Sequence, residues 1–152
     1  MRKRPKILFI STGNPTRSQM AEGFLKSLAG DDFDAVSVGI QSAAPSAQAE
    51  QVMKEIGIDI TARKPKTVRE SLKEHFAYVV SIADGSKERW PVFPFTSNLV
   101  KWNETDPATA RDEKSDGLTA YRSIRDDIRP KVEALVQRLR REHSVAPLRR
   151  TA

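Results

Sequence analysis

Residues 6–23 read KILFISTGNPTRSQMAEG, and the expected fold follows from this stretch. It begins with a continuous apolar run at 7–10, the pattern of a strand that is buried on both faces. A cluster of turn-forming residues follows at 11–16. From Arg17 onward the apolar residues recur with the period of an amphipathic helix. The stretch therefore predicts a buried strand, a tight loop and a helix in direct succession.

The rest of the chain repeats this alternation of strand and helix patterns. Further strands are predicted at 35–39, 77–82 and 99–102, and helices at 17–29, 49–56, 67–76 and 121–139. Pro130 lies inside the last helical pattern, where it is expected to kink the helix or to start a new one. Such alternation indicates an α/β domain with a mostly parallel sheet.

The composition narrows the class of protein. A length of 152 residues fits one domain, placed at 1–143, with a flexible basic tail at 144–152. The absence of cysteine excludes disulfides, thiolate metal sites and redox chemistry on the chain's own thiols. The apolar runs are too short for a membrane span or a signal peptide, so a cytoplasmic protein is expected. No residue spacing suggests a metal site, and no cofactor is expected.

The net charge of +6 is unevenly distributed along the chain. Residues 1–10 carry four cations and no acid, residues 122–152 carry nine cations against four acids, and the middle is net acidic. A nucleic-acid-binding protein concentrates basic and aromatic residues on its recognition elements, so this placement argues against one. It fits a solvated basic face, or a structural or regulatory module that binds an acidic partner through its ends.

The loop at 11–18 is the segment whose residues could bind a ligand or take part in a reaction. It follows a predicted parallel strand, at the edge where α/β sheets bind ligands. Backbone N–H groups and the start of the next helix can converge there on an anion. Gly13 and Asn14 are residue types that tolerate a positive φ. The hydroxyl groups available as further donors are those of Ser11, Thr12 and Thr16.

Arg17 distinguishes an anion-binding loop from an ordinary turn. As an ordinary turn, the segment would need only Thr16 or another hydroxyl to cap the helix. A cation in the first helical turn faces the positive end of the helix dipole, which is unfavourable. Unless Arg17 reaches an acid elsewhere, it is best explained as a bidentate hydrogen-bond donor to a tetrahedral oxyanion.

The motif FISTGNPTRSQMAEG at 9–23 resembles the phosphate-binding loop of the low-molecular-weight tyrosine phosphatases and the thioredoxin-coupled arsenate reductases. Four further segments resemble that family in the same order. They are VMKEIGIDIT at 52–61, VVSIADGSKERWPVFP at 79–94, KWNETDPATA at 101–110 and RSIRDDI at 122–128. The resemblance implies a three-layer α/β sandwich, with a parallel sheet of about four strands flanked by helices.

The resemblance also implies the site. The oxyanion would be bound by Ser11, Thr12, Gly13, Asn14, Pro15, Thr16, Arg17 and Ser18, with Asp106 at the position of the general acid. The family's nucleophilic cysteine falls on Ser11, a second loop cysteine on Thr16, and two redox cysteines on Ala83 and Trp90. Since all four are replaced, reduction of arsenate through a disulfide cascade is excluded for this chain acting alone.

These replacements favour binding over catalysis. The pKa of an alkyl alcohol lies several units above the value near 8.5 of a thiol, so Ser11 would need an activating base, and no histidine is close in sequence. We therefore expect a protein that binds phosphate, arsenate or a phosphorylated ligand without turnover. The alternative is a phosphatase or arsenate reductase-like enzyme, either weakly active or with an engineered serine at position 11.

Three residues outside the loop keep two interpretations each. Asp84 either holds the loop through its N–H groups or caps the following turn. Trp102 either walls the pocket or packs in the core. Asp106 either occupies the general-acid position, as the family resemblance implies, or only starts an Asp-Pro turn.

Overall fold

The computed structural model describes the chain in six stretches. These are residues 4–40, 46–61, 68–71, 73–90, 98–109 and 117–143. The elements are β1 (Lys6–Ser11), α1 (Thr16–Ala29), β2 (Asp34–Gly39), α2 (Ala47–Lys54), α3 (Val68–Ser71), β3 (Tyr78–Ala83), β4 (Leu99–Asn103), the 3-10 helix η1 (Pro107–Thr109) and α4 (Thr119–His143). The basic tail predicted at 144–152 lies outside the described residues.

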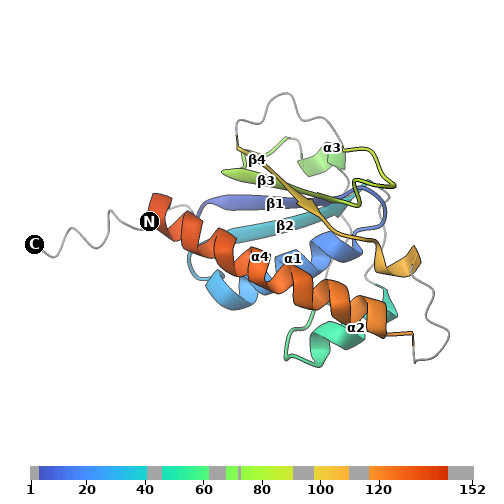
Figure 1. Ribbon diagram of the computed structural model, residues 1–152. Coiled ribbons are helices and arrows are strands. Elements are labelled where there is room, and N and C mark those ends of the chain that lie inside the picture. Colours follow the sequence, from blue (N-terminus) through green and yellow to red (C-terminus); the bar gives the residue numbers. More distant parts are fainter. Residues whose placement is uncertain are drawn as a thin grey trace, which may run out of the picture.

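The four strands form one parallel sheet in the order β2-β1-β3-β4. Helices α1, α2 and α4 cover one face, and the short helix α3 lies against the other (Figure 1). This arrangement confirms the predicted three-layer α/β sandwich with a four-stranded parallel sheet. Because β1 lies between β2 and β3, the loop that follows β1 emerges at the centre of the sheet edge.

Strand β1 is buried on both faces, as its continuous apolar run predicts. Ile7 and Phe9 belong to the main hydrophobic cluster, which joins the sheet to α1, α2 and α4. Leu8 and Ile10 point to the opposite face and form a smaller cluster with residues of β2 and β3. The alternation of side chains along a strand therefore divides one apolar run between the two sides of the sheet.

The long helix α4 supplies more buried residues to the main hydrophobic cluster than either α1 or α2 does. All of its predicted apolar positions are buried, namely Tyr121, Ile124, Ile128, Val132, Leu135, Val136 and Leu139. Pro130 lies on the exposed side, and the structure has one helix across it rather than two. On α1 the helical spacing of the apolar residues predicts one buried stripe of Met20, Ala21, Phe24, Leu25 and Leu28. The first four are buried, but Leu28, with 38% of its surface exposed, lies outside the core, so that part of the prediction is wrong.

The largest difference from the sequence prediction falls between 67 and 76. Of this predicted helix, the structure describes only α3 (Val68–Ser71) as helical, and the chain continues through turns. The physical reason is that the chain must deliver Phe76 to the smaller cluster and then enter β3, with the amide of Ala77 bonded to the carbonyl of Lys6.

Helix α2 also differs slightly from the prediction. It begins at Ala47, two residues earlier than predicted, because the Ser46 side chain caps it by accepting from the amide of Ala49 at 3.1 Å. The helix stops before Gly57, whose φ of 81° lies in the left-handed region that favours glycine.

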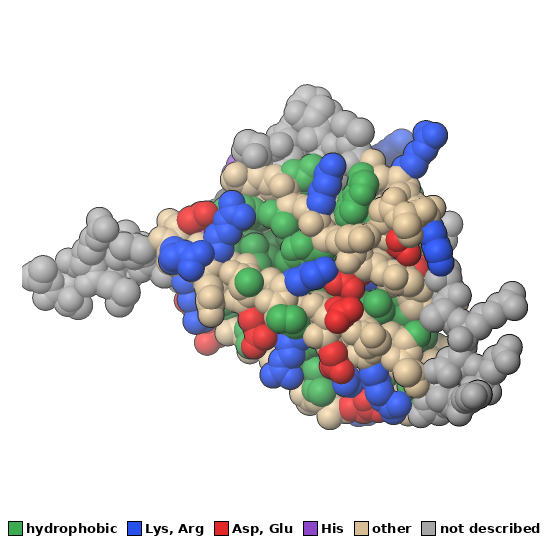
Figure 2. Space-filling model, viewed as in Figure 1, with side chains coloured by type: hydrophobic (Ala, Val, Ile, Leu, Met, Phe, Trp, Pro, Cys, Tyr) green, Lys and Arg blue, Asp and Glu red, His purple; other side chains and the backbone are tan. Residues whose placement is uncertain are grey.

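The surface over α4 mixes charges of both signs. Figure 2 shows Lys and Arg side chains interspersed with Asp and Glu on the face that α4 crosses. This agrees with a solvated charged face rather than a single basic patch on that side. Within the ranges that the structure describes, no helix is long and apolar enough to cross a membrane.

Core packing between α4 and the sheet can be tested with Ile128→Ala. Ile128 has no exposed surface, so the substitution leaves a cavity, and we expect it to lower the free energy of unfolding by about 2–5 kcal/mol. Leu28→Ala, on the exposed side of α1, is the matched control and should change it by less than about 1 kcal/mol. Urea denaturation followed by circular dichroism measures both, and equal effects would contradict the assigned core.

Candidate functional site

The loop that follows β1 is held at the sheet edge by backbone bonds to both neighbouring strands. The amide of Thr12 donates to the carbonyl of Ile82 at the end of β3, at 3.2 Å. The carbonyl of Ser11 accepts from the amide of Ile40, just past β2, at 3.1 Å. The loop therefore lies at the carboxyl ends of three strands, where the sequence predicts a binding site.

Ser11 lies at the base of this loop with no exposed surface. Its Oγ accepts a hydrogen bond from the amide of Ser18, in the first turn of α1, at 2.8 Å. The Ser18 hydroxyl in turn lies 2.9 Å from the carbonyl oxygen of Pro15 and 3.0 Å from that of Val38. The amino-terminal turn of α1 is thus directed at Ser11, the position that the family resemblance gives to the nucleophile.

The start of α1 differs from an ordinary turn with a hydroxyl cap. Pro15, and not Thr16 or another hydroxyl residue, occupies the cap position, and no side chain caps it. Instead the amide of Thr16 donates to Oδ1 of Asn14 at 3.1 Å. Neither Gly13 nor Asn14 has a positive φ, since among the described glycines only Gly57 and Gly117 do.

The Arg17 side chain is completely buried, and its guanidinium is bound to a carboxylate. Nη1 donates to Oε1 of Glu88 at 2.8 Å and Nη2 donates to Oε2 at 3.2 Å, which makes the contact bidentate. Nη1 also donates to the carbonyl of Glu104 at 2.9 Å. Nε has no hydrogen-bond partner in the part of the chain that the structure describes. Arg17 therefore reaches an acid elsewhere in the chain and retains one unused donor.

Glu88 carries the anionic group nearest to the loop. Besides Arg17, its carboxylate accepts from Oγ1 of Thr12 at 2.6 Å and from the amide of Asp84 at 2.7 Å. Burial by itself raises the pKa of Glu88, but the hydrogen bonds from Arg17, Thr12 and the Asp84 amide outweigh it and lower the pKa to about 2. The carboxylate is consequently ionised at every pH at which proteins normally work.

Asp106, at the predicted general-acid position, is brought to the same place. Its Oδ2 accepts from Nδ2 of Asn14 at 3.0 Å, and its Oδ1 accepts from the amide of Ala108 at the start of η1. A Cβ built on Gly13 would lie 3.7 Å from Oε2 of Glu88 and 3.9 Å from both Oδ2 of Asp106 and Nη2 of Arg17. Two carboxylates and one guanidinium therefore converge over Gly13.

The structure decides between the interpretations left open for two further residues. Asp84 caps the turn after β3, because its Oδ1 accepts from both the amide and the hydroxyl of Ser86, and these bonds lower its pKa. Trp102 packs in the core, with its ring centroid 5.9 Å from that of Phe9. Within the described ranges, neither side chain is hydrogen-bonded to the loop.

Neither histidine lies near Ser11. The ring of His143 packs edge-on against Phe33, which precedes β2, and His75 precedes β3. Both are therefore at the edge where the strands begin, opposite the loop. Among the described residues, no group of three or more His, Asp or Glu side chains could hold a metal ion. Neither histidine is placed to act as a base for Ser11.

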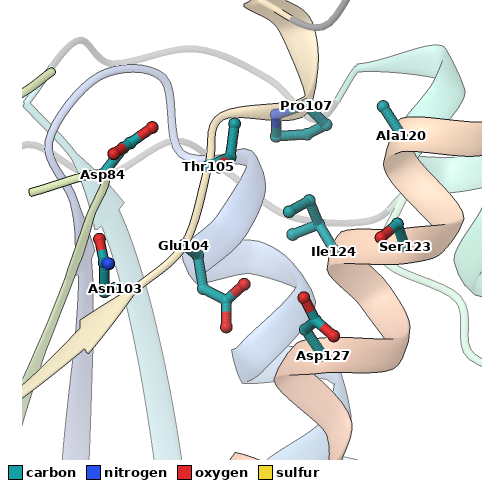
Figure 3. Close-up of a pocket in the computed structure, with 9 residues that line it drawn as sticks. All are labelled: Asp84, Asn103, Glu104, Thr105, Pro107, Ala120, Ser123, Ile124 and Asp127. Carbon is teal, nitrogen blue, oxygen red and sulfur yellow. The ribbon is translucent and has the colours of Figure 1, made fainter. Parts of the chain in front are cut away.

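A pocket of about 350 Å³ lies beside the loop, between the ends of β3 and β4 and the start of α4 (Figure 3). It is acidic: Asp84, Glu104 and Asp127 are among its lining residues. Glu104 is buried, which raises its pKa against the opposing effect of its ion pair with Lys131, and Asp127 raises it further. The lining of this pocket is therefore rich in acidic groups, which disfavours an anion within the pocket itself.

Glu88 is the site residue that sequence reasoning missed. A buried cation in the first turn of a helix needs an acid, and no sequence pattern indicates directly which one. The resemblance contained an indirect signal, because it places redox cysteines at positions 83 and 90, which must be able to approach position 11. An acid between those two positions was therefore a candidate partner for Arg17.

The comparisons with known proteins agree with this fold. The model of the family "Low molecular weight phosphotyrosine protein phosphatase" matches residues 6–145. That range covers almost the whole chain, and the chain belongs to this family.

Similar proteins include arsenate reductases. One from Halalkalibacterium halodurans is 34% identical over 131 residues, which are 86% of this chain and 94% of that protein. A solved structure described as an arsenate reductase in the phosphate binding state is 26% identical, with a TM-score of 0.72, covering 88% of this chain and 98% of that one. The tyrosine phosphatase of T. tengcongensis, at 24% identity and a TM-score of 0.69, shares the fold and covers 89% of this chain and 99% of its own.

The Glu88 ion pair predicts a specific dependence of stability on pH. Because the pKa of Glu88 is lower in the folded chain than its ordinary value of 4.5, the carboxylate stabilises the fold above pH 4.5. This contribution is lost as the pH falls from 4.5 to about 2. We expect the difference in free energy of unfolding between the wild type and Glu88→Gln to shrink by up to about 3 kcal/mol over that window.

Urea denaturation at a series of pH values measures this difference. Comparison with Glu88→Gln removes the parallel contribution of Glu55, whose pKa is also lowered to about 2, chiefly by the hydrogen bond from Arg122. A difference that does not change with pH would contradict the ion pair.

Proposed function

We propose that this chain is a non-catalytic, oxyanion-binding member of its family. One observation carries the proposal: the loop retains a fully buried guanidinium, that of Arg17, which holds an oxyanion, the carboxylate of Glu88, in a bidentate contact. A group that binds a carboxylate in this geometry also matches two oxygens of phosphate or arsenate. The proposed ligand is phosphate, arsenate or a phosphorylated molecule.

The remaining donors of the loop support this proposal. The amides of Gly13 and Asn14 donate to no acceptor in the part of the chain that the structure describes, and Nε of Arg17 is likewise unused. Nε of Arg17 is buried, and buried donors are usually satisfied, so this unused donor favours a bound anion. Gly13 and Asn14 are partly exposed, and their amides would be further donors to it. Ser11, Thr12, Thr16 and Ser18 would complete the site, with Asp106 as a polar neighbour.

The loss of catalysis follows from the chemistry at Ser11. Its Oγ already accepts from the amide of Ser18, and neither histidine is near. The same amide, helix terminus and guanidinium would lower the pKa of a thiol below neutral, but an alcohol starts several units higher and stays protonated. A phosphorylated ligand would therefore be bound without attack on its phosphorus atom.

Hydrolysis of p-nitrophenyl phosphate tests the absence of catalysis. We expect no rate above the uncatalysed one for the unmodified chain. We expect hydrolysis to appear in the double variant Ser11→Cys/Glu88→Ala, because it supplies a thiolate and vacates the guanidinium. Turnover by the unmodified chain would show an active enzyme and contradict the proposal, and an inactive double variant would show that the loop is not arranged for in-line attack.

A further inference from the structure

Glu88 makes the contacts that an incoming oxyanion would need. Both terminal nitrogens of Arg17 and the hydroxyl of Thr12 donate to its carboxylate, and all three groups belong to the loop or to the first turn of α1. Glu88 itself comes from the turn after β3, 71 residues from Arg17 in the sequence. A side chain from outside the loop thus occupies the position at which the loop would hold a ligand.

A second anion has no place beside this carboxylate. Oε2 of Glu88 and Oδ2 of Asp106 both lie within 4 Å of the Cβ position of Gly13. The guanidinium of Arg17 already faces two carboxylates there, and both would repel an incoming anion. An oxyanion therefore reaches Arg17 only when the Glu88 side chain leaves it.

The Glu88 side chain can leave without dismantling the turn that carries it. Its side chain is 23% exposed, whereas that of Arg17 is not exposed at all, so the acid is the partner that lies toward solvent. One bond of the turn would be lost, because the carboxylate accepts from the amide of Asp84 at 2.7 Å. Two others do not involve the carboxylate: the backbone amide of Glu88 donates to the carbonyl of Asp84 at 2.7 Å, and the amide of Gly85 donates to Oδ1 of Asn103 at 2.8 Å. Rotation of the Glu88 side chain would therefore free Arg17 while these two backbone bonds remain.

We propose that Glu88 determines the specificity of this site: it occupies the anion position as an internal carboxylate, and only a doubly charged oxyanion such as phosphate or arsenate displaces it. This inference rests on the oxyanion-binding function proposed above. A free monocarboxylate offers Arg17 the same group as Glu88 but lacks the tether, which gives Glu88 a high effective concentration. A dianion brings a second charge, and it has further oxygens for the amides of Gly13 and Asn14 and for Nε of Arg17.

The experiment measures the binding of inorganic phosphate and of formate by NMR titration, following the Nε–H resonance of Arg17. The proteins are the wild type, Glu88→Ala, Glu88→Gln and the control Glu55→Gln. Glu55 is the matched control because it also pairs with arginines, Arg122 and Arg125, and lies outside the site. Glu88→Gln keeps the size of the side chain and serves if Glu88→Ala does not fold.

The expected pattern separates the inference from the function on which it rests. Glu88→Ala should bind phosphate at least about tenfold more tightly than the wild type and should also bind formate, which fills the position of the missing carboxylate. Glu88→Gln should shift phosphate affinity in the same direction by less, and Glu55→Gln should behave as the wild type.

Two outcomes would contradict the proposals in different ways. If the wild type and the Glu88 variants bind phosphate equally well, the specificity role of Glu88 is wrong and the oxyanion-binding function stands. If phosphate binds to none of them, the function itself is wrong, and the role of Glu88 falls with it.

Discussion

A guanidinium without access to water must find its acceptors inside the protein, and this requirement at Arg17 organises the functional end of the molecule. The backbone places Arg17 in the first turn of α1, where the helix dipole is unfavourable to a cation. Glu88 supplies the compensating charge, and the carbonyl of Glu104 supplies a further acceptor. Through these two contacts the loop after β1, the turn after β3 and the segment after β4 are joined at one point.

The same contact explains how a loop suited to anions persists in a chain without cysteine. With a thiolate absent, the buried guanidinium would lack a directly hydrogen-bonded negative charge. The Glu88 carboxylate removes that difficulty, and its pKa of about 2 shows how strongly the surroundings favour its ionised form. The charge of Arg17 is therefore compensated within the chain, and under the proposed function a ligand has to compete with Glu88.

Much of this could be predicted from the sequence, for reasons tied to particular residues. The run at 7–10 predicted a strand buried on both faces, and the structure confirms it. The spacing from Tyr121 to Leu139 predicted a buried helical face but left open whether Pro130 starts a new helix, and the structure has one helix there. The position of Asp106 beside Asn14 followed from family resemblance alone. Glu88 could not be predicted directly, because its contact with Arg17 joins segments 71 residues apart and leaves no periodic pattern in either. The helix predicted at 67–76 failed for a similar reason, since packing of Phe76 overrides local propensity.

The central claim is that the loop around Arg17 is an anion site that the chain itself fills. The most direct measurement is a crystal structure after soaking in phosphate at high concentration. The account predicts tetrahedral density in bidentate contact with Arg17 and the Glu88 carboxylate turned away toward solvent. Crystals in which Glu88 still holds Arg17, and in which Glu88→Ala under the same soak shows no density at the loop, would contradict it.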